Sequence, residues 1–140
     1  DLGCGWGPIA TIMSLESPHA AVWAVDVNSR AVDLTQRNAQ SNGATGVRAL
    51  KAEEALAVSQ ESDTHFDVIW SNPPVRIGKD AMHEMLLAWL SRLAPTGVAY
   101  LVVQRNLGAD SLITWLSGQG YQASKYASKK GFRIIEARPA

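Results

Sequence analysis

Two adjacent prolines follow an apolar run, and with the residue before them they form the tripeptide whose chemistry is clearest in this chain. Asn72-Pro73-Pro74 directly follows residues 66–71, whose apolar pattern predicts a buried strand. Proline lacks a backbone N–H and restricts the residue before it to extended conformations, so the pair stops the strand. The sequence therefore predicts that the Asn72 amide and the Pro73 carbonyl lie together at the carboxyl end of a strand. There they can accept the two hydrogens of a planar NH2 group.

A second set of residues with suggestive spacing lies at the start of the chain. Gly3, Gly5 and Gly7 leave bare backbone where a strand turns into a helix, so a ligand can approach the main chain at a helix N-terminus. Asp26 ends the next predicted strand and is placed to accept hydrogen bonds from both hydroxyls of a ribose. The glycine spacing differs from that of the dinucleotide fingerprint. Together with Asp1, the acidic edge favours a ligand that carries a ribose and a positive charge.

These residues need an alternation of strands and helices to position them. The apolar pattern predicts strands over residues 20–25, 47–51, 66–71 and 98–103, followed by an antiparallel hairpin of strands 121–127 and 132–137. Helices are predicted over residues 8–16, 53–58, 82–93 and 110–117. This order is typical of a doubly wound α/β fold, mostly parallel, with an antiparallel addition at one edge.

One further helix is predicted between the strands that end near residues 25 and 47. Asn28 or Ser29 can cap it, and Asn42-Gly43 can end it. Ala31, Leu34 and Asn38 share one face of this helix.

Length and composition limit the class of protein. The 140 residues, 46% of them hydrophobic, suffice for one core, so we expect a single domain over residues 1–140. No apolar stretch approaches the roughly 18 residues of a membrane span. The single cysteine, Cys4, excludes an intramolecular disulfide and indicates a cytoplasmic setting. We expect Cys4 to be a small buried residue of the glycine turn and not a nucleophile.

The formal net charge is zero, but the charges are unevenly distributed. Residues 1–75 hold nine acidic and four basic residues, whereas residues 76–140 hold four acidic and nine basic ones. The acidic half suits a cationic ligand, and the basic half could contact phosphates. A solvated surface with chance asymmetry explains the same distribution equally well.

Three motifs carry a resemblance to a known family. Asp1-Leu2-Gly3-Cys4-Gly5-Trp6-Gly7, Val25-Asp26-Val27-Asn28 and Asn72-Pro73-Pro74 resemble motifs I, II and IV of class I S-adenosylmethionine-dependent methyltransferases, and the third motif is typical of enzymes that methylate planar nitrogens. Over essentially all 140 residues the chain further resembles the small-subunit ribosomal RNA guanine-N2 methyltransferase C-like family; the additional motifs are Gly78-Lys79, Gln104-Arg105-Asn106 and Lys129-Lys130-Gly131-Phe132. The resemblance implies a Rossmann-like methyltransferase domain. Its first strand is expected to be largely missing from this sequence.

The resemblance also implies a role for individual residues. Asn72 and Pro73 are the expected catalytic residues. The cofactor, S-adenosyl-L-methionine, is expected at Asp1, Gly3, Cys4, Gly5, Asp26, Val27, Glu53 and Asn72, and the substrate at Pro74, Val75, Arg76 and Lys79. The implied substrate is guanine N2 in ribosomal RNA, with ribosomal RNA or the small ribosomal subunit as partner and no metal or membrane.

Two alternatives remain open. The first alternative is methylation of protein glutamine or of adenine N6, because enzymes with these activities use similar Asn-Pro-Pro segments. Such enzymes usually carry Tyr after the prolines, where this chain has Val75. An aromatic ring at that position would stack on a flipped base. The other alternative is a non-catalytic, RNA-binding domain that keeps the fold.

Overall fold

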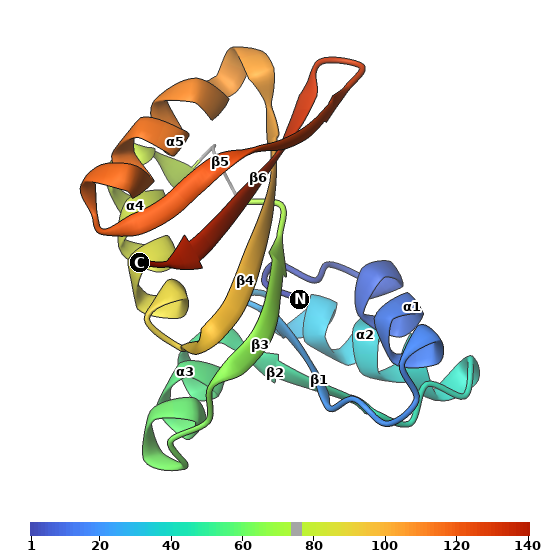
Figure 1. Ribbon diagram of the computed structural model, residues 1–140. Coiled ribbons are helices and arrows are strands. Elements are labelled where there is room, and N and C mark those ends of the chain that lie inside the picture. The colour runs from blue at the N-terminus through green and yellow to red at the C-terminus, as the bar shows by residue number, and fades with distance from the viewer. Residues whose placement is uncertain (74–76) are drawn as a thin grey trace. The chain divides into compact units, whose positions relative to one another are not determined.

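Strands and helices alternate along the chain in the predicted order. The computed structural model describes residues 1–73 and 77–140 (Figure 1). They form two compact units, Asp1–Ser62 and Asp63–Ala140. Each unit contains its own strands and helices, and each is described by itself below.

The first unit is built on two parallel strands. β1 (Val22–Asp26) pairs with β2 (Val47–Lys51), with Asp26 opposite Lys51. Leu2 adds a parallel bridge to Val25. The helices of this unit are α1 (Pro8–Glu16), α2 (Ser29–Ser41) and α3 (Ala52–Glu61). The core consists mainly of small side chains, which allow helices and strands to approach closely: Cys4, Ala10, Val22, Ala24, Ala39, Ala44 and Val47.

The starts of α1 and α2 follow local rules. Pro8 begins α1 at a position where its missing N–H leaves no bond unmade. The Asn28 side chain caps α2 by accepting the backbone N–H of residues 30 and 31. The side of α2 that packs into the core carries Thr35 and Ala39, which are completely buried, whereas Leu34 is 39% exposed. The third helix is longer than predicted, since α3 covers residues 52–61.

The second unit contains a four-stranded mixed sheet in the order β3-β4-β6-β5. β3 and β4 are parallel, and β6 is antiparallel to both β4 and β5. The strands are β3 (Phe66–Ser71), β4 (Leu93–Gln104), β5 (Tyr121–Lys129) and β6 (Phe132–Pro139). The predicted terminal antiparallel hairpin is thus confirmed, with β6 inserted between β4 and β5.

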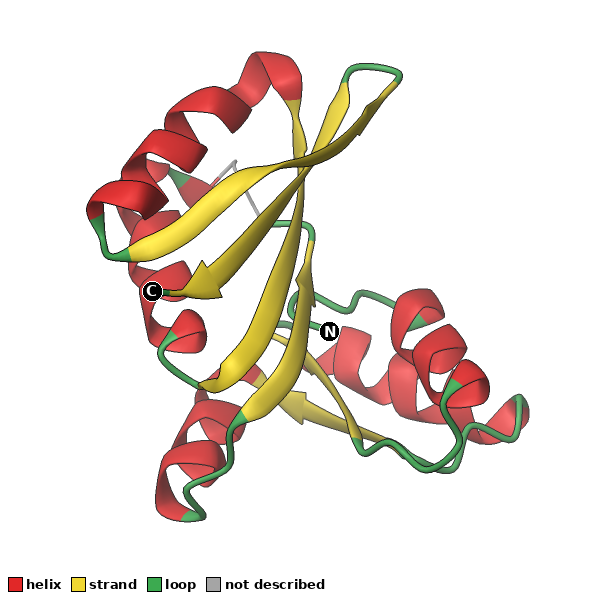
Figure 2. Ribbon diagram, viewed as in Figure 1, coloured by secondary structure: helices red, strands yellow, loops and turns green. Residues whose placement is uncertain are grey.

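Two helices cover one face of this sheet. Figure 2 shows α4 (Lys79–Leu90) and α5 (Ala109–Gly118) on the same side of the four strands. Fully buried side chains from both helices and from the sheet form the core of the unit: Leu86, Leu101, Leu116 and Ile135. None of the helices in residues 1–73 and 77–140 has the length and apolar character needed to cross a membrane.

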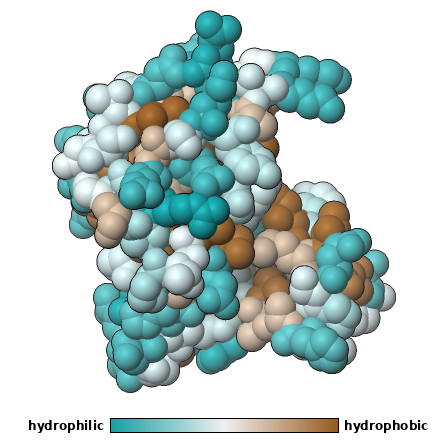
Figure 3. All heavy atoms as spheres, viewed as in Figure 1, coloured by the Kyte–Doolittle hydropathy of each residue, from teal (hydrophilic) through white to brown (hydrophobic). Residues whose placement is uncertain are grey.

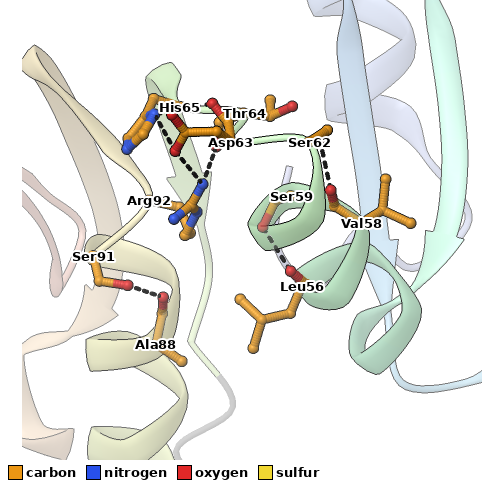
Figure 4. Close-up of polar contacts among 10 residues, drawn as sticks. All are labelled: Leu56, Val58, Ser59, Ser62, Asp63, Thr64, His65, Ala88, Ser91 and Arg92. Atoms are coloured by element: carbon orange, nitrogen blue, oxygen red, sulfur yellow. Dashed lines mark hydrogen bonds and ion pairs between the residues drawn. The ribbon is translucent and has the colours of Figure 1, made fainter.

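An arginine in the turn after α4 fixes the start of β3. Arg92 Nη2 donates to the Thr64 carbonyl at 2.8 Å and lies 3.7 Å from a carboxylate oxygen of Asp63 (Figure 4). The His65 ring lies 3.8 Å from the same carboxylate. The Arg92 carbonyl in turn accepts the Phe66 N–H at 2.8 Å. These contacts fix the start of β3. They thereby help to position Asn72, which follows the carboxyl end of this strand.

β4 begins earlier than predicted. Phe66 pairs with Leu93 and Val68 with Val98, so β4 advances five residues while β3 advances two. The irregular segment contains Pro95, which has no N–H to donate to a ladder, and an irregularity is where a strand can hold a proline. The sequence analysis took Pro95 as the end of a helix over residues 82–93 and began the strand at Val98, whereas α4 ends at Leu90 and β4 begins at Leu93.

Candidate functional site

The glycine turn at the start of the chain is tied to the end of β1. The N–H groups of Gly3 and Cys4 both donate to the Val25 carbonyl, at 2.7 and 2.9 Å. Gly3, Gly5 and Gly7 all have positive φ, a conformation that side chains disfavour. The turn therefore exposes main chain beside a strand end and directly before α1, as the sequence predicts.

Two polar side chains of α2 hold the turn from the other side. Thr35 Oγ1 donates to the Gly5 carbonyl at 2.8 Å, and Asn38 Nδ2 donates to the Trp6 carbonyl at 2.7 Å. Because these carbonyls are bonded to α2, the course of the turn is set without a ligand. Sequence reasoning missed Thr35; the available signal was a threonine three residues before an asparagine, which puts both on one helix face.

The contact with Thr35 makes Gly7 more constrained than Gly5, where an added Cβ would meet nothing within 4 Å. A Cβ at Gly7 would lie 2.7 Å from Thr35 Cγ2, at φ +91°, whereas a Cβ at Gly43, at φ +73°, would meet nothing within 4 Å. Gly43→Ala therefore measures the conformational cost alone, about 1 to 2 kcal/mol. We expect Gly7→Ala to lower the free energy of unfolding by at least about 1 kcal/mol more, because Thr35 must also shift. Urea unfolding of the two variants tests this, and equal losses would contradict it.

Asp26 lies at the carboxyl end of β1 with part of its acceptor capacity in use. Its Oδ2 accepts the Gly5 N–H and its Oδ1 accepts the Asn28 N–H, both at 3.0 Å. A carboxylate offers about four acceptor positions, so each oxygen can accept one further hydrogen bond. The next side chain, Val27, is 78% exposed and offers an apolar surface beside this carboxylate. The pair matches what a ribose and an attached planar base require.

Two further acids belong to the same unit. Asp1 Oδ2 is buried and has no hydrogen-bond partner among residues 1–73 and 77–140, so it can still accept a donor. Glu53 is exposed in the first turn of α3 and follows β2, whose Lys51 is the register partner of Asp26. The first unit thus brings Asp1, the glycine turn, Asp26, Val27 and Glu53 to the carboxyl edge of its strands.

Cys4 is buried in the turn, as predicted. Its Sγ lies 3.4 Å from Thr35 Oγ1, and only 5% of the residue is exposed. Burial raises the pKa of the Cys4 thiol, and the nearby Asp26 carboxylate raises it further, against a lowering by the Thr35 contact. Cys4 is therefore a protonated packing residue at neutral pH.

The thiol of Cys4 should accordingly be unreactive. We expect the native protein at pH 7 to react with a disulfide reagent far more slowly than the same protein in urea, because the thiolate is the reactive form and burial disfavours it. The rate should rise only at alkaline pH. A native rate equal to the denatured rate would show that Cys4 is accessible and ionised.

The second unit holds the remaining predicted residues. Asn72 follows β3 with an exposed side chain whose amide makes no hydrogen bond to the described residues, whereas Pro73 and the preceding Ser71 are buried. A buried residue on either side restricts the backbone of Asn72. Lys79 is exposed at the first position of α4. The predictions for Pro74, Val75 and Arg76 lie outside the described residues.

Comparison with known proteins supplies the relatives of this chain. A family model described as the methyltransferase small domain matches residues 1–136. The uncharacterized protein YbxB of Bacillus subtilis is 34% identical over 138 residues, which cover 99% of this chain and 68% of that protein. The release factor glutamine methyltransferase of Flavobacterium psychrophilum is 28% identical over 151 residues, covering 97% of this chain and 49% of that enzyme. The ribosomal RNA small subunit methyltransferase C of Acinetobacter baylyi is 29% identical over 142 residues, covering 99% and 40%.

The chain thus spans about two thirds of one of these relatives and half or less of the other two. Among solved structures, a T. thermophilus 16S rRNA N2 methyltransferase in complex with AdoMet and guanosine superposes with a TM-score of 0.78. The match has 24% identity and covers all of this chain and 36% of that one. A TehB-like SAM-dependent methyltransferase from Corynebacterium glutamicum superposes with a TM-score of 0.76 at 19% identity, covering 100% of this chain and 78% of that one. These likenesses establish the Rossmann-like α/β fold predicted from the sequence.

Proposed function

The chain belongs to the methyltransferase small domain family, and on this premise we propose that it transfers a methyl group from S-adenosyl-L-methionine to the exocyclic N2 amine of a guanine in ribosomal RNA. The observation that carries the proposal is the exposed Asn72 amide, held between two buried residues at the carboxyl end of β3. Relatives named as ribosomal RNA methyltransferases support the substrate class. A cytoplasmic setting, expected from the single cysteine, is part of the same proposal.

The residues of the first unit fit the methyl donor. S-adenosyl-L-methionine supplies, when bound, a methyl group on a positively charged sulfonium. Asp26 has one free acceptor position on each carboxylate oxygen for the two ribose hydroxyls, since backbone N–H groups occupy the others. Val27 offers an exposed apolar surface for the adenine, and Glu53 is a candidate contact at that end. The buried Asp1 Oδ2, which has no hydrogen-bond partner in the described part of the chain, provides negative charge for a cationic group.

The backbone of the turn completes the donor site. Gly3 is exposed and Gly5 is half-buried, and neither has a side chain, so the donor can approach the main chain at these two residues, while the Cys4 side chain packs inward. The carbonyls of Gly5 and Trp6 are bonded to α2, so this backbone is preorganised before the donor arrives.

Asn72 and Pro73 act on the methyl acceptor. The amine of guanine is a weak nucleophile because its lone pair is delocalised into the ring. Asn72 Oδ1 and the Pro73 carbonyl oxygen each accept one N–H, which favours a pyramidal nitrogen and leaves its lone pair free. Both acceptors are uncharged, so the chain contributes position and electrostatics and needs no strong base before transfer. The proton of the methylated product leaves afterwards to water or a neighbouring carbonyl.

A second candidate function is methylation of a glutamine side chain in a protein. The observation in its favour is the relative named as a release factor glutamine methyltransferase, at 28% identity. A glutamine amide is also a planar NH2 group, so Asn72 and Pro73 would hold it in the same way. The positive charge of residues 76–140 favours the nucleic acid. Adenine N6 methylation and a non-catalytic RNA-binding role are the remaining alternatives.

The decisive experiment uses the complete protein with hypomethylated small ribosomal subunits and labelled methyl donor. Nucleoside mass spectrometry should detect N2-methylguanine. Methylated adenine, or label in protein, would reject the proposed substrate in favour of the corresponding alternative. Donor binding without transfer to either class of acceptor would favour the non-catalytic role.

A further inference from the structure

A pocket in the second unit has no role in the site described above. It has a volume of about 500 Å³ and lies where β4 ends and the β5–β6 hairpin turns. Its lining comes from three segments that are distant in sequence: Gln104, Arg105 and Asn106, Asp110, and Lys130, Gly131 and Phe132. The first and third segments are among the motifs that carry the family resemblance, and their basic residues belong to the half of the sequence that could contact phosphates.

The pocket walls are held in place by backbone pairing. Gln104 and Phe132 are register partners in the β4–β6 ladder, and the Arg105 N–H extends the ladder to the Gly131 carbonyl at 2.7 Å. Lys130 and Gly131 form the two-residue turn of the hairpin, and both have positive φ. Such a turn matches the twist of the two strands that it joins. Asn, Asp and Gly are the usual residues at the first of these positions. Here a lysine occupies it and lines the pocket.

The lining combines positive charge with an exposed ring. Asp110 is ion-paired with Arg133, so its charge is compensated and the cations Arg105 and Lys130 are left to dominate. Phe132 is 41% exposed, although it is an aromatic residue at a strand start. Figure 3 shows hydrophilic side chains projecting around the hairpin turn at the top of the view. The ring is therefore an isolated apolar surface among polar groups.

These groups match the parts of a nucleotide. Arg105 and Lys130 can neutralise a phosphate, and an exposed phenylalanine can stack on a base of any sequence. The amides of Gln104 and Asn106 can donate to and accept from a base edge. A bare phosphate would leave the ring unused, and an apolar peptide would leave the cations unpaired. The volume also accommodates a base with its sugar.

The pocket lies on the same edge of the sheet as Asn72. Ser71 of β3 pairs with Leu101 of the parallel strand β4. Asn72 is therefore level with Val102, and Gln104 lies two residues further along β4. With adjacent strands about 4.8 Å apart and a rise of about 3.3 Å per residue, the two backbones are on the order of 8 Å apart. We propose that this pocket binds a ribonucleotide that adjoins the methylated guanine, with its base on Phe132 and its phosphate at Arg105 and Lys130. The proposal rests on the proposed function, since it deepens the RNA substrate of that site.

The test compares two pocket variants with one control in the complete protein. Lys130→Asn removes the charge and keeps a residue suited to positive φ, and Phe132→Leu removes the ring and keeps an apolar side chain. Arg138→Gln is the control, because it removes one positive charge from β6 outside the pocket lining. The measurements are kcat and KM for hypomethylated small ribosomal subunits. The Kd for a fluorescent single-stranded RNA 12-mer is measured at several salt concentrations.

Both pocket variants should raise KM and Kd about fivefold or more, the low end of what one base–aromatic stack contributes. Lys130→Asn should also reduce the salt slope of binding by about one. We expect kcat within twofold of the parent protein and the control unchanged. Values of KM and Kd within twofold for both pocket variants would overturn the assignment, as would an absence of RNA binding. Weakened RNA binding without any RNA methylation would support the pocket and reject the proposed function.

Discussion

Asn72→Ala in the complete protein should bind S-adenosyl-L-methionine and lose most of its methyl transfer. We expect a loss of about 2 to 4 kcal/mol of transition-state stabilisation, comparable to the removal of one preorganised polar group from an active site. The reason is that Asn72 Oδ1 accepts one N–H of the acceptor amine, and alanine offers no acceptor. The exposed side chain of Asn72 makes no hydrogen bond to the described residues, so its removal should not affect folding. Single-turnover transfer rates measure the effect.

A conservative variant separates the lost acceptor from a general disturbance. Asn72→Asp keeps an oxygen at the same position, so it should retain more activity than Asn72→Ala. Unchanged turnover in Asn72→Ala would remove this residue from the chemistry. Equal losses in both variants, with unchanged thermal stability, would indicate that the amide nitrogen of Asn72 matters and not its oxygen.

Asp26→Ala should weaken binding of S-adenosyl-L-methionine by about 10- to 100-fold. A hydrogen bond to a charged group contributes about 1.5 to 3 kcal/mol, and the carboxylate is expected to accept from the ribose hydroxyls. Part of the loss should come from the turn, since Asp26 also accepts the N–H groups of Gly5 and Asn28. Titration calorimetry of the complete protein measures the affinity.

The matched control for this variant is Asp33→Ala. Asp33→Ala changes the net charge by the same amount as Asp26→Ala. Asp33 is an exposed residue of α2, and its carboxylate lies 3.2 Å from the Arg37 guanidinium. A surface pair of this kind contributes at most about 1 kcal/mol to stability. We expect unaltered donor affinity for Asp33→Ala. If Asp26→Ala also leaves the affinity unaltered, Asp26 does not hold the ribose.

Much of the fold follows from short-range signals in the sequence. Pro8 begins α1, and β2 and β3 have the predicted limits, because their ends are marked by prolines, glycines and abrupt changes in polarity. The predictions were wrong where long-range pairing overrides these signals. Pro95 was taken as a boundary, yet β4 continues through it because the irregular pairing with β3 leaves no N–H required at that position.

The sequence by itself determined which residues are candidates for a site and that they lie at the ends of strands. The glycine turn, Asp26 and Asn72-Pro73 were recognisable because glycine, proline and strand-end acids act through local backbone geometry. It did not determine what supports them. Thr35 and Asn38 reach the turn over 30 and 32 residues, respectively.

Only the tertiary structure decided which polar groups face one another. It turned α2 so that Thr35 is buried and Leu34 exposed, and it paired Gln104 with Phe132 to form the wall of a pocket. Such contacts depend on strand register and on which helix face meets the core, and several arrangements of nearly equal local energy satisfy the same sequence pattern. The choice among them is made by the packing of the whole unit, and it is this choice that creates the pocket beside the carboxyl end of β4.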